Sequence, residues 1–134
     1  MASALSTYLG NSLLRWIGGN AMPTAPAACY LALFDGDPKA SGTEVTTTID
    51  AAGRQAITWS VPSAGVTNTM SNSAVVDFGN AAGAVANLSH MAIMDASTGG
   101  NILASAALNG GPYSVASGTP VNFPSSNISL QVGS

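Results

Sequence analysis

The chain has 134 residues, of which 46% are hydrophobic and only 7% are charged, with a formal net charge of −3. Its three cations are too few for nucleic-acid binding through a basic patch or for polybasic attachment to a membrane, and its hydrophobic content excludes intrinsic disorder. This length predicts one domain, residues 1–134, with a core of its own. Soluble domains usually carry roughly 25% charged residues, so the composition predicts a chain that packs against other subunits and forms a homo-oligomer.

The sequence offers little that would cross-link or anchor the chain. The single cysteine, Cys29, cannot form an intramolecular disulfide, and we expect it to be a small buried hydrophobic residue. No apolar run approaches the roughly 18 residues of a membrane-spanning helix. The first residues also lack the basic segment of a signal peptide. We therefore expect neither a disulfide framework nor a membrane anchor.

The first predicted element is a helix over residues 3–17. Apolar residues recur there at four-residue spacing, as on one face of a helix: Leu5, Leu9, Leu13 and Ile17. Ser3 or Ser6 can cap its start, and Gly18 with Gly19 can end it. This face is suited either to lie on the β core or to dock on a neighbouring subunit.

The next predicted element is a continuous apolar strand over residues 28–34. It is followed by a polar turn at residues 35–38, which ends the strand. A second run, residues 90–94, has a similar pattern and is also followed by an aspartate and a glycine-rich turn. Continuous apolar runs of this length are typical of strands buried on both faces. We therefore expect these two runs to be the central strands of one β core.

The remaining strands are predicted from short segments between turns. Residues 54–61 alternate, with Ile57, Trp59 and Val61 on one face of a half-buried strand. Further strands are predicted at residues 44–48 (or an extended arm), 66–72 (a possible edge strand), 74–78, 101–108 (in a hairpin with the strand in 84–95), 120–123 and 127–132. About seven or eight short strands predict a mainly β fold: a single antiparallel β-sandwich or jelly-roll-like domain over residues 28–134, with one N-terminal α-helix within residues 1–19.

No pattern in the sequence predicts catalysis. The only histidine, His90, lies at the start of an apolar strand, and no Gly-x-Ser-x-Gly segment presents a nucleophile to it. One cysteine and one histidine are too few for a zinc site, and Lys39 occupies a ligand position of a calcium loop that would begin at Asp35. We expect no enzyme activity, no cofactor and no metal.

The larger aromatic residues allow two interpretations. Trp16, Trp59 and Tyr113 are dispersed along the sequence. Dispersed aromatic residues favour core packing, which is the interpretation adopted, and an aromatic platform for a saccharide is the alternative.

A series of short segments, taken in order along the chain, resembles a known protein family. The segments are RW at 15–16, YLALF at 30–34, DP at 37–38, GTEV at 42–45, GRQAI at 53–57, NSA and VDF between 72 and 78, HMAIMD at 90–95 and TGGNIL at 98–103. From about residue 5 to the last strand, the chain resembles the small virion proteins of tailed bacteriophages that are often named tail-fibre proteins. Members commonly have a Tyr-Ala-Arg-Gln segment, where this chain has Ala52, Gly53, Arg54 and Gln55. The resemblance implies a location in the virion, on the capsid surface or in the tail.

The resemblance and the composition together predict a non-enzymatic structural protein of a phage virion. A chain of 134 residues lacks the length and the repeats of a fibre shaft, so we expect a capsid cement or decoration protein that bridges subunits of the major capsid protein. The alternatives are a tail-fibre or tail-tip component that contacts other virion subunits, and a receptor- or glycan-binding β-sandwich module. The residues expected to contact partners lie in the helix and in the loop after the first strand: Leu9, Leu13, Trp16, Asp35, Asp37, Glu44 and Val45.

Overall fold

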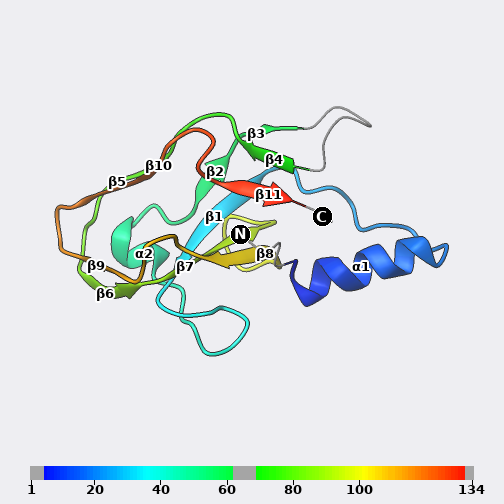
Figure 1. Ribbon diagram of the computed structural model, residues 1–134, viewed down its shortest axis with the longest axis horizontal. Coiled ribbons are helices and arrows are strands. Elements are labelled where there is room, and N and C mark those ends of the chain that lie inside the picture. The colour runs from blue at the N-terminus through cyan, green and yellow to red at the C-terminus, as the bar shows by residue number, and fades with distance from the viewer. Residues whose placement is uncertain (1–4, 62–68, 132–134) are drawn as a thin grey trace.

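The computed structural model describes residues 5–61 and 69–131 as an antiparallel β structure with a helix, α1 (Thr7–Ile17), at its N-terminal end (Figure 1). Ser6 caps this helix, because its Oγ accepts a backbone N–H hydrogen bond from the first helical turn at 3.0 Å. Ser3, the other predicted cap, lies outside the described residues. The predicted helix is therefore confirmed, with Ser6 as its cap.

The start of the helix differs from the prediction, which placed it three residues before Ser6. Leu5 instead pairs with Ala104 in a β-bridge, and the N–H of Ser6 donates to the carbonyl oxygen of Leu103 at 2.9 Å. These contacts hold the chain extended beside another strand, so the helix begins only after Ser6. It ends at Gly18, as predicted.

The main sheet is built around β1 (Cys29–Phe34). This strand lies between β2 (Gln55–Ile57) and β7 (His90–Met94), and β8 (Ile102–Ala107) pairs with the other side of β7. The resulting strand order is β2-β1-β7-β8, and all neighbours are antiparallel. The two apolar runs predicted as central strands are therefore adjacent, as expected.

Both faces of β1 are buried. Leu31, Ala32 and Leu33 have no exposed surface. Leu31 and Leu33 belong to the larger hydrophobic cluster, whereas Ala32 and Phe34 pack with Met94 in a smaller cluster on the opposite face. The continuous apolar pattern is thus explained by a strand that has a core on each side.

Cys29, at the start of β1, is half-buried and packs against the larger cluster. Burial raises the pKa of its thiol, which therefore stays protonated at neutral pH. The residue contributes to packing, although it is less buried than predicted.

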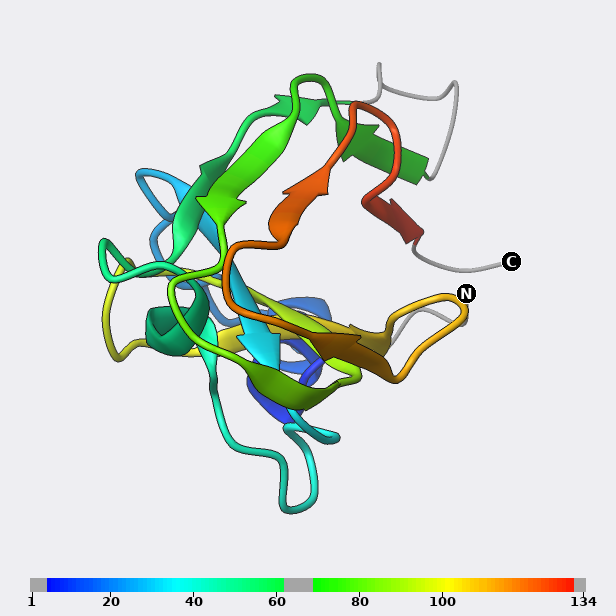
Figure 2. The same ribbon diagram turned by 90° about the vertical axis from the view of Figure 1, so that its left-hand side faces the viewer.

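Residues 69–131 form one long antiparallel ribbon, which closes at a turn that contains Gly99 and Gly100, both at positive φ. Its two arms pair as β7 with β8, β6 (Val85–Leu88) with β9 (Tyr113–Val115), β5 (Val76–Asn80) with β10 (Pro120–Phe123), and β4 (Thr69–Asn72) with β11 (Ser129–Gln131). Bends between these pairs curl the ribbon round (Figure 2). This mainly β, jelly-roll-like winding confirms the predicted fold class.

The strand predicted at residues 54–61 divides at Thr58. Its first part is β2, and its second part, β3 (Trp59–Ser60), pairs with β4 instead of β1. Ile57 is buried and Trp59 half-buried, as the alternation predicts. Val61 is 74% exposed, contrary to the prediction, because it lies beyond the last paired residue.

The strand or extended arm predicted at residues 44–48 is wrong, because a helical turn, α2 (Thr46–Ile49), occupies most of it. Only Glu44 pairs like a strand residue, in a bridge with Phe34. The fully buried Oγ1 of Thr46 accepts the N–H of Leu33 at 3.0 Å and donates to Oε2 of Glu44 at 2.7 Å. These bonds fix the helical turn against β1. Their contribution outweighs the preference of the threonines in α2 for a strand.

Asn72, at the end of β4, joins the two arms of the ribbon. Its side chain is completely buried. Its Nδ2 donates to the carbonyl oxygens of Ala74 and Pro124 at 2.8 and 2.9 Å, and its Oδ1 accepts the N–H of Ile128 at 2.8 Å. One side chain thus satisfies three backbone groups at a bend where no regular strand pairing does so.

We predict that Asn72→Ala lowers the free energy of unfolding by about 2–4 kcal/mol, because it leaves three backbone groups, the buried N–H of Ile128 among them, without this partner. Urea unfolding followed by circular dichroism measures this change. Asn87→Ala, at an exposed position of β6, is the matched control and should change stability by less than about 0.5 kcal/mol. Equal stability of the two variants would contradict the role assigned to Asn72.

Candidate interaction surfaces

The helix α1 lies against β8 at its start and then extends beyond the strands (Figure 1). Ser6 and Ser12 are buried on the side that faces the body, and the Ser12 hydroxyl donates to a carbonyl oxygen of the preceding turn at 2.9 Å. Leu9 and Leu13 are half-buried. The first two turns therefore attach the helix, and the last turn projects.

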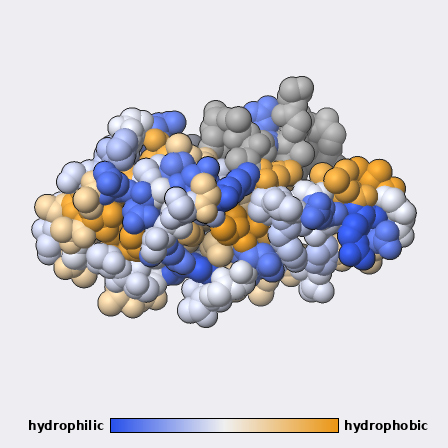
Figure 3. All heavy atoms as spheres, turned by 90° about the horizontal axis from the view of Figure 1, so that it is seen from below, coloured by the Kyte–Doolittle hydropathy of each residue, from blue (hydrophilic) through white to orange (hydrophobic). Residues whose placement is uncertain are grey.

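The projecting end of α1 exposes large apolar side chains. Leu14, Trp16 and Ile17 are 67%, 57% and 69% exposed, and Met22 is also exposed just after the helix. We refer to these four residues as the apolar helix end. Figure 3 shows hydrophobic side chains gathered at the end of the molecule that α1 forms. Contiguous exposed apolar side chains are typical of interaction sites.

The predicted helix contacts divide between the body and the apolar helix end. Leu9 and Leu13 are half-buried, whereas Trp16 is exposed. The prediction missed Leu14, and it placed Ile17 on the same face as Leu9. Residues spaced by four drift about 40° per step around a helix, so a stripe that begins on the body leaves it within three steps.

The loop of residues 35–45 is tied within itself. Oδ1 of Asp35 accepts the N–H of Thr43 at 2.7 Å, and Oδ1 of Asp37 accepts the N–H of Lys39 at 2.9 Å. Gly42 lies so close to the opposite side of the loop that a Cβ there would be 2.2 Å from a carbonyl oxygen. The two aspartates therefore shape the loop, and their contact with a partner stays a prediction.

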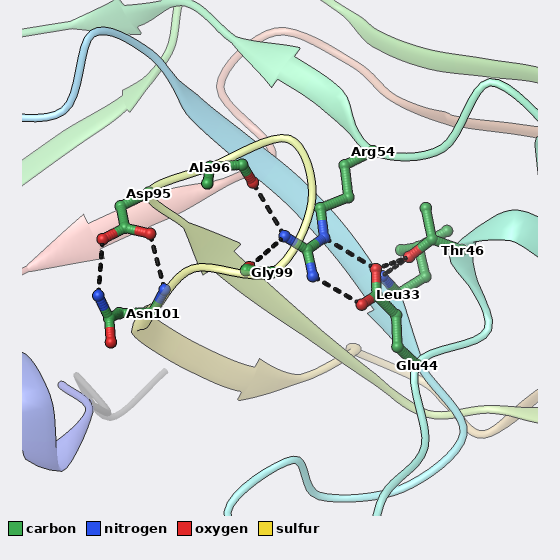
Figure 4. Close-up of polar contacts among 8 residues, drawn as sticks. All are labelled: Leu33, Glu44, Thr46, Arg54, Asp95, Ala96, Gly99 and Asn101. Carbon is green, nitrogen blue, oxygen red and sulfur yellow. Dashed lines mark hydrogen bonds and ion pairs between the residues drawn. The ribbon is translucent and has the colours of Figure 1, made fainter.

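Arg54 clamps this loop to the turn that closes the ribbon (Figure 4). Its side chain is only 7% exposed. Its Nε and Nη2 donate to the two carboxylate oxygens of Glu44 at 2.9 and 2.8 Å, and its Nη1 donates to the carbonyl oxygens of Ala96 and Gly99 at 2.9 and 2.8 Å. One guanidinium thus joins three segments that are far apart in sequence.

The carboxylates at both ends of this clamp are stabilised in their ionised forms. The hydrogen bonds from Arg54 hold the pKa of Glu44 below its ordinary value, against the effect of burial. The backbone and side-chain N–H groups of Asn101 lower the pKa of Asp95 in the same way. Val45, beside Glu44, packs against the larger cluster. Glu44 and Val45 are thus engaged inside the chain, and a partner contact for them also stays a prediction.

We predict that Arg54→Ala lowers the free energy of unfolding by about 2–3 kcal/mol, because four hydrogen bonds are lost and Glu44 is left without its counter-ion. Arg54→Lys should recover less than half of the loss, since an ammonium cannot reach both carboxylate oxygens and both carbonyl groups. Urea unfolding at neutral pH measures both variants. The control is Arg15→Ala, at an exposed position of α1. If Arg15→Ala lowers the free energy of unfolding as much as Arg54→Ala does, the hydrogen bonds of Arg54 do not stabilise the fold specifically.

The pH dependence of stability gives a separate prediction. Because the pKa of Glu44 is lowered in the folded chain, its ionised form stabilises the fold at neutral pH, and this contribution disappears as the pH falls through that lowered pKa. Glu44→Gln should therefore be less stable than the wild type at pH 7 and lose less stability on acidification. Unfolding midpoints measured from pH 7 to pH 3 test this, and parallel curves for both proteins would refute it.

No helix in residues 5–61 or 69–131 is long and apolar enough to cross a membrane. Within the same ranges, no group of three histidine, cysteine, aspartate or glutamate side chains is placed to hold a metal ion.

Comparison with known proteins identifies the family. A family described as "Podophage GP4 fiber I protein gp80" matches residues 4–131, which is nearly the whole chain. No protein in a search of curated sequences matches significantly. The match agrees with the resemblance found in the sequence and with the tail-fibre alternative. The chain therefore belongs to this family of podophage fibre proteins and is a structural protein of a tailed-phage virion.

Proposed function

We propose that the chain is an adhesive, non-enzymatic fibre subunit that docks on a neighbouring virion subunit through the apolar helix end. The observation that supports this proposal is the exposure of Leu14, Trp16 and Ile17 together on a helix that projects from the strands. Burying one such side chain stabilises an interface by about 1.5–3 kcal/mol. Because association itself costs several kcal/mol, a contact that buries all three would anchor the subunit as part of a larger interface.

The charge distribution supports the same proposal. Only 7% of the residues are charged, so little electrostatic repulsion opposes close approach of neighbouring subunits. The apolar helix end contains no charged residue, and Arg15 is its one charged neighbour within the helix. The neighbouring subunit is another copy of this chain or a different virion protein, and we expect an apolar patch on it.

A capsid cement or decoration role is the second candidate. It is supported by the low charge of the chain, which suits packing against a shell of other subunits. The family description supports the fibre role instead. Both roles use the same kind of apolar contact, but they differ in where the chain is found in the particle. Purified tails should retain a fibre subunit, whereas tail-free capsids should retain a cement protein.

We predict that Leu14→Ser combined with Ile17→Ser lowers the amount of the chain in purified particles more than tenfold, because two apolar anchors are removed. Quantitative mass spectrometry of particles grown with the variant as the only source of the chain measures this. The isolated variant should unfold within about 0.5 kcal/mol of the wild type, since both positions are exposed.

The matched control replaces two exposed apolar residues of the β body, Val61→Ser and Val75→Ser. This control should enter particles at the wild-type level. Normal incorporation of the helix variant, or an equal loss for the control, would reject docking through the apolar helix end.

A further inference from the structure

A groove of about 540 Å³ lies on the inner side of the curled ribbon, between its β6–β9 part and the strands β10 and β11. One wall comes from β6, β9 and the end of β8, and the other from β10 and β11. Its base is formed by side chains of the core, among them Leu88, Met91, Val115 and Val121. This volume is within the usual range of small-molecule binding sites.

The rim of this groove is polar but uncharged. None of the described residues that line it is charged. Three exposed asparagines stand on it, Asn109, Asn122 and Asn127, and their side-chain amides make no hydrogen bond to another described residue. Each amide has two donors and an acceptor oxygen available to a ligand.

One aromatic ring is held in place at the groove. Tyr113 is 45% exposed, and its hydroxyl donates to the carbonyl oxygen of Asn109. The ring lies against the turn at Gly110 and Gly111, where added Cβ atoms would be 3.1 Å from its hydroxyl and 3.5 Å from its Cδ2. Gly110 is also at positive φ, which a side chain there would disfavour. The turn therefore fixes the ring before any ligand arrives.

We propose that this groove binds a neutral saccharide. A sugar ring offers C–H groups that pack on an aromatic ring or an apolar base, and hydroxyls that both donate and accept hydrogen bonds. Tyr113 supplies a rigid amphipathic contact, and the three asparagines supply adaptable hydrogen bonding, the combination that protein binding surfaces often use. The absence of charge from the described lining selects for a neutral ligand over an acidic one. The site is separate from the apolar helix end and does not depend on it.

The test is binding of the isolated full chain to an array of neutral hexose and N-acetylhexosamine oligosaccharides, printed beside their sulfated and uronic-acid counterparts. We expect binding to some neutral oligosaccharides and weaker binding to their acidic counterparts. Titration calorimetry with the best neutral oligosaccharide should show about tenfold weaker binding for Tyr113→Ala and near wild-type binding for Tyr113→Phe. Asn122→Ala and Asn127→Ala should each weaken binding about fivefold.

Matched controls are Tyr8→Ala, on α1, and Asn80→Ala, on β5, both exposed and outside the groove. They should bind as the wild type does. If Tyr113→Ala fails to fold, the exposed Asn122 and Asn127 variants still decide the question. The proposal is overturned if no neutral oligosaccharide binds, or if binding is unaffected by all the groove variants.

Two further outcomes separate this site from the docking surface. Groove variants should enter particles normally, and the Leu14 and Ile17 double variant should bind the oligosaccharide normally. If the groove variants instead dissociate an oligomer in light scattering while the wild type binds no saccharide, the groove is a subunit interface and the proposal is wrong.

Discussion

The pairing of β1 with β7 is the interaction on which the rest of the structure depends. Five residue pairs, from Tyr30 with Met94 to Phe34 with His90, join the N-terminal third of the chain to the long ribbon. β2 and α2 attach to β1, and β8 attaches to β7. Because β1 is buried on both faces, any displacement would expose two clusters at once. The strands thus form a firm body, from which the end of α1 projects.

Most of the few charged residues make hydrogen bonds within the chain. All six acidic residues accept hydrogen bonds within it, five from backbone N–H groups and Glu44 from Arg54 and Thr46: Asp35, Asp37, Asp50, Asp77, Asp95 and Glu44. Most of these bonds shape loops, as expected for aspartates in turns, whereas that of Asp77 lies within β5. Because only 7% of the residues are charged, little charge keeps neighbouring subunits apart, which agrees with a protein that works inside a larger particle.

The sequence was sufficient where one local pattern decides the structure. Continuous apolar runs identified β1 and β7, and the glycine signal identified the end of α1, whereas the start of α1 was predicted too early. Sequence patterns failed where contacts between residues that are distant in the sequence decide the structure. The α2 turn depends on the contact of Thr46 with β1, and β9 is only three residues long and pairs with a distant strand. Tyr113 was interpreted as a core residue because spacing cannot reveal that two bends of the ribbon open a groove beside it.

The most direct test of the proposed function is a particle reconstruction at side-chain resolution. It should show Leu14, Trp16 and Ile17 buried against a neighbouring subunit in every copy of the chain. Such a contact would explain why a helix that the β body covers only in part keeps an apolar end. A reconstruction in which the apolar helix end faces solvent, while another surface makes the subunit contacts, would contradict the proposal.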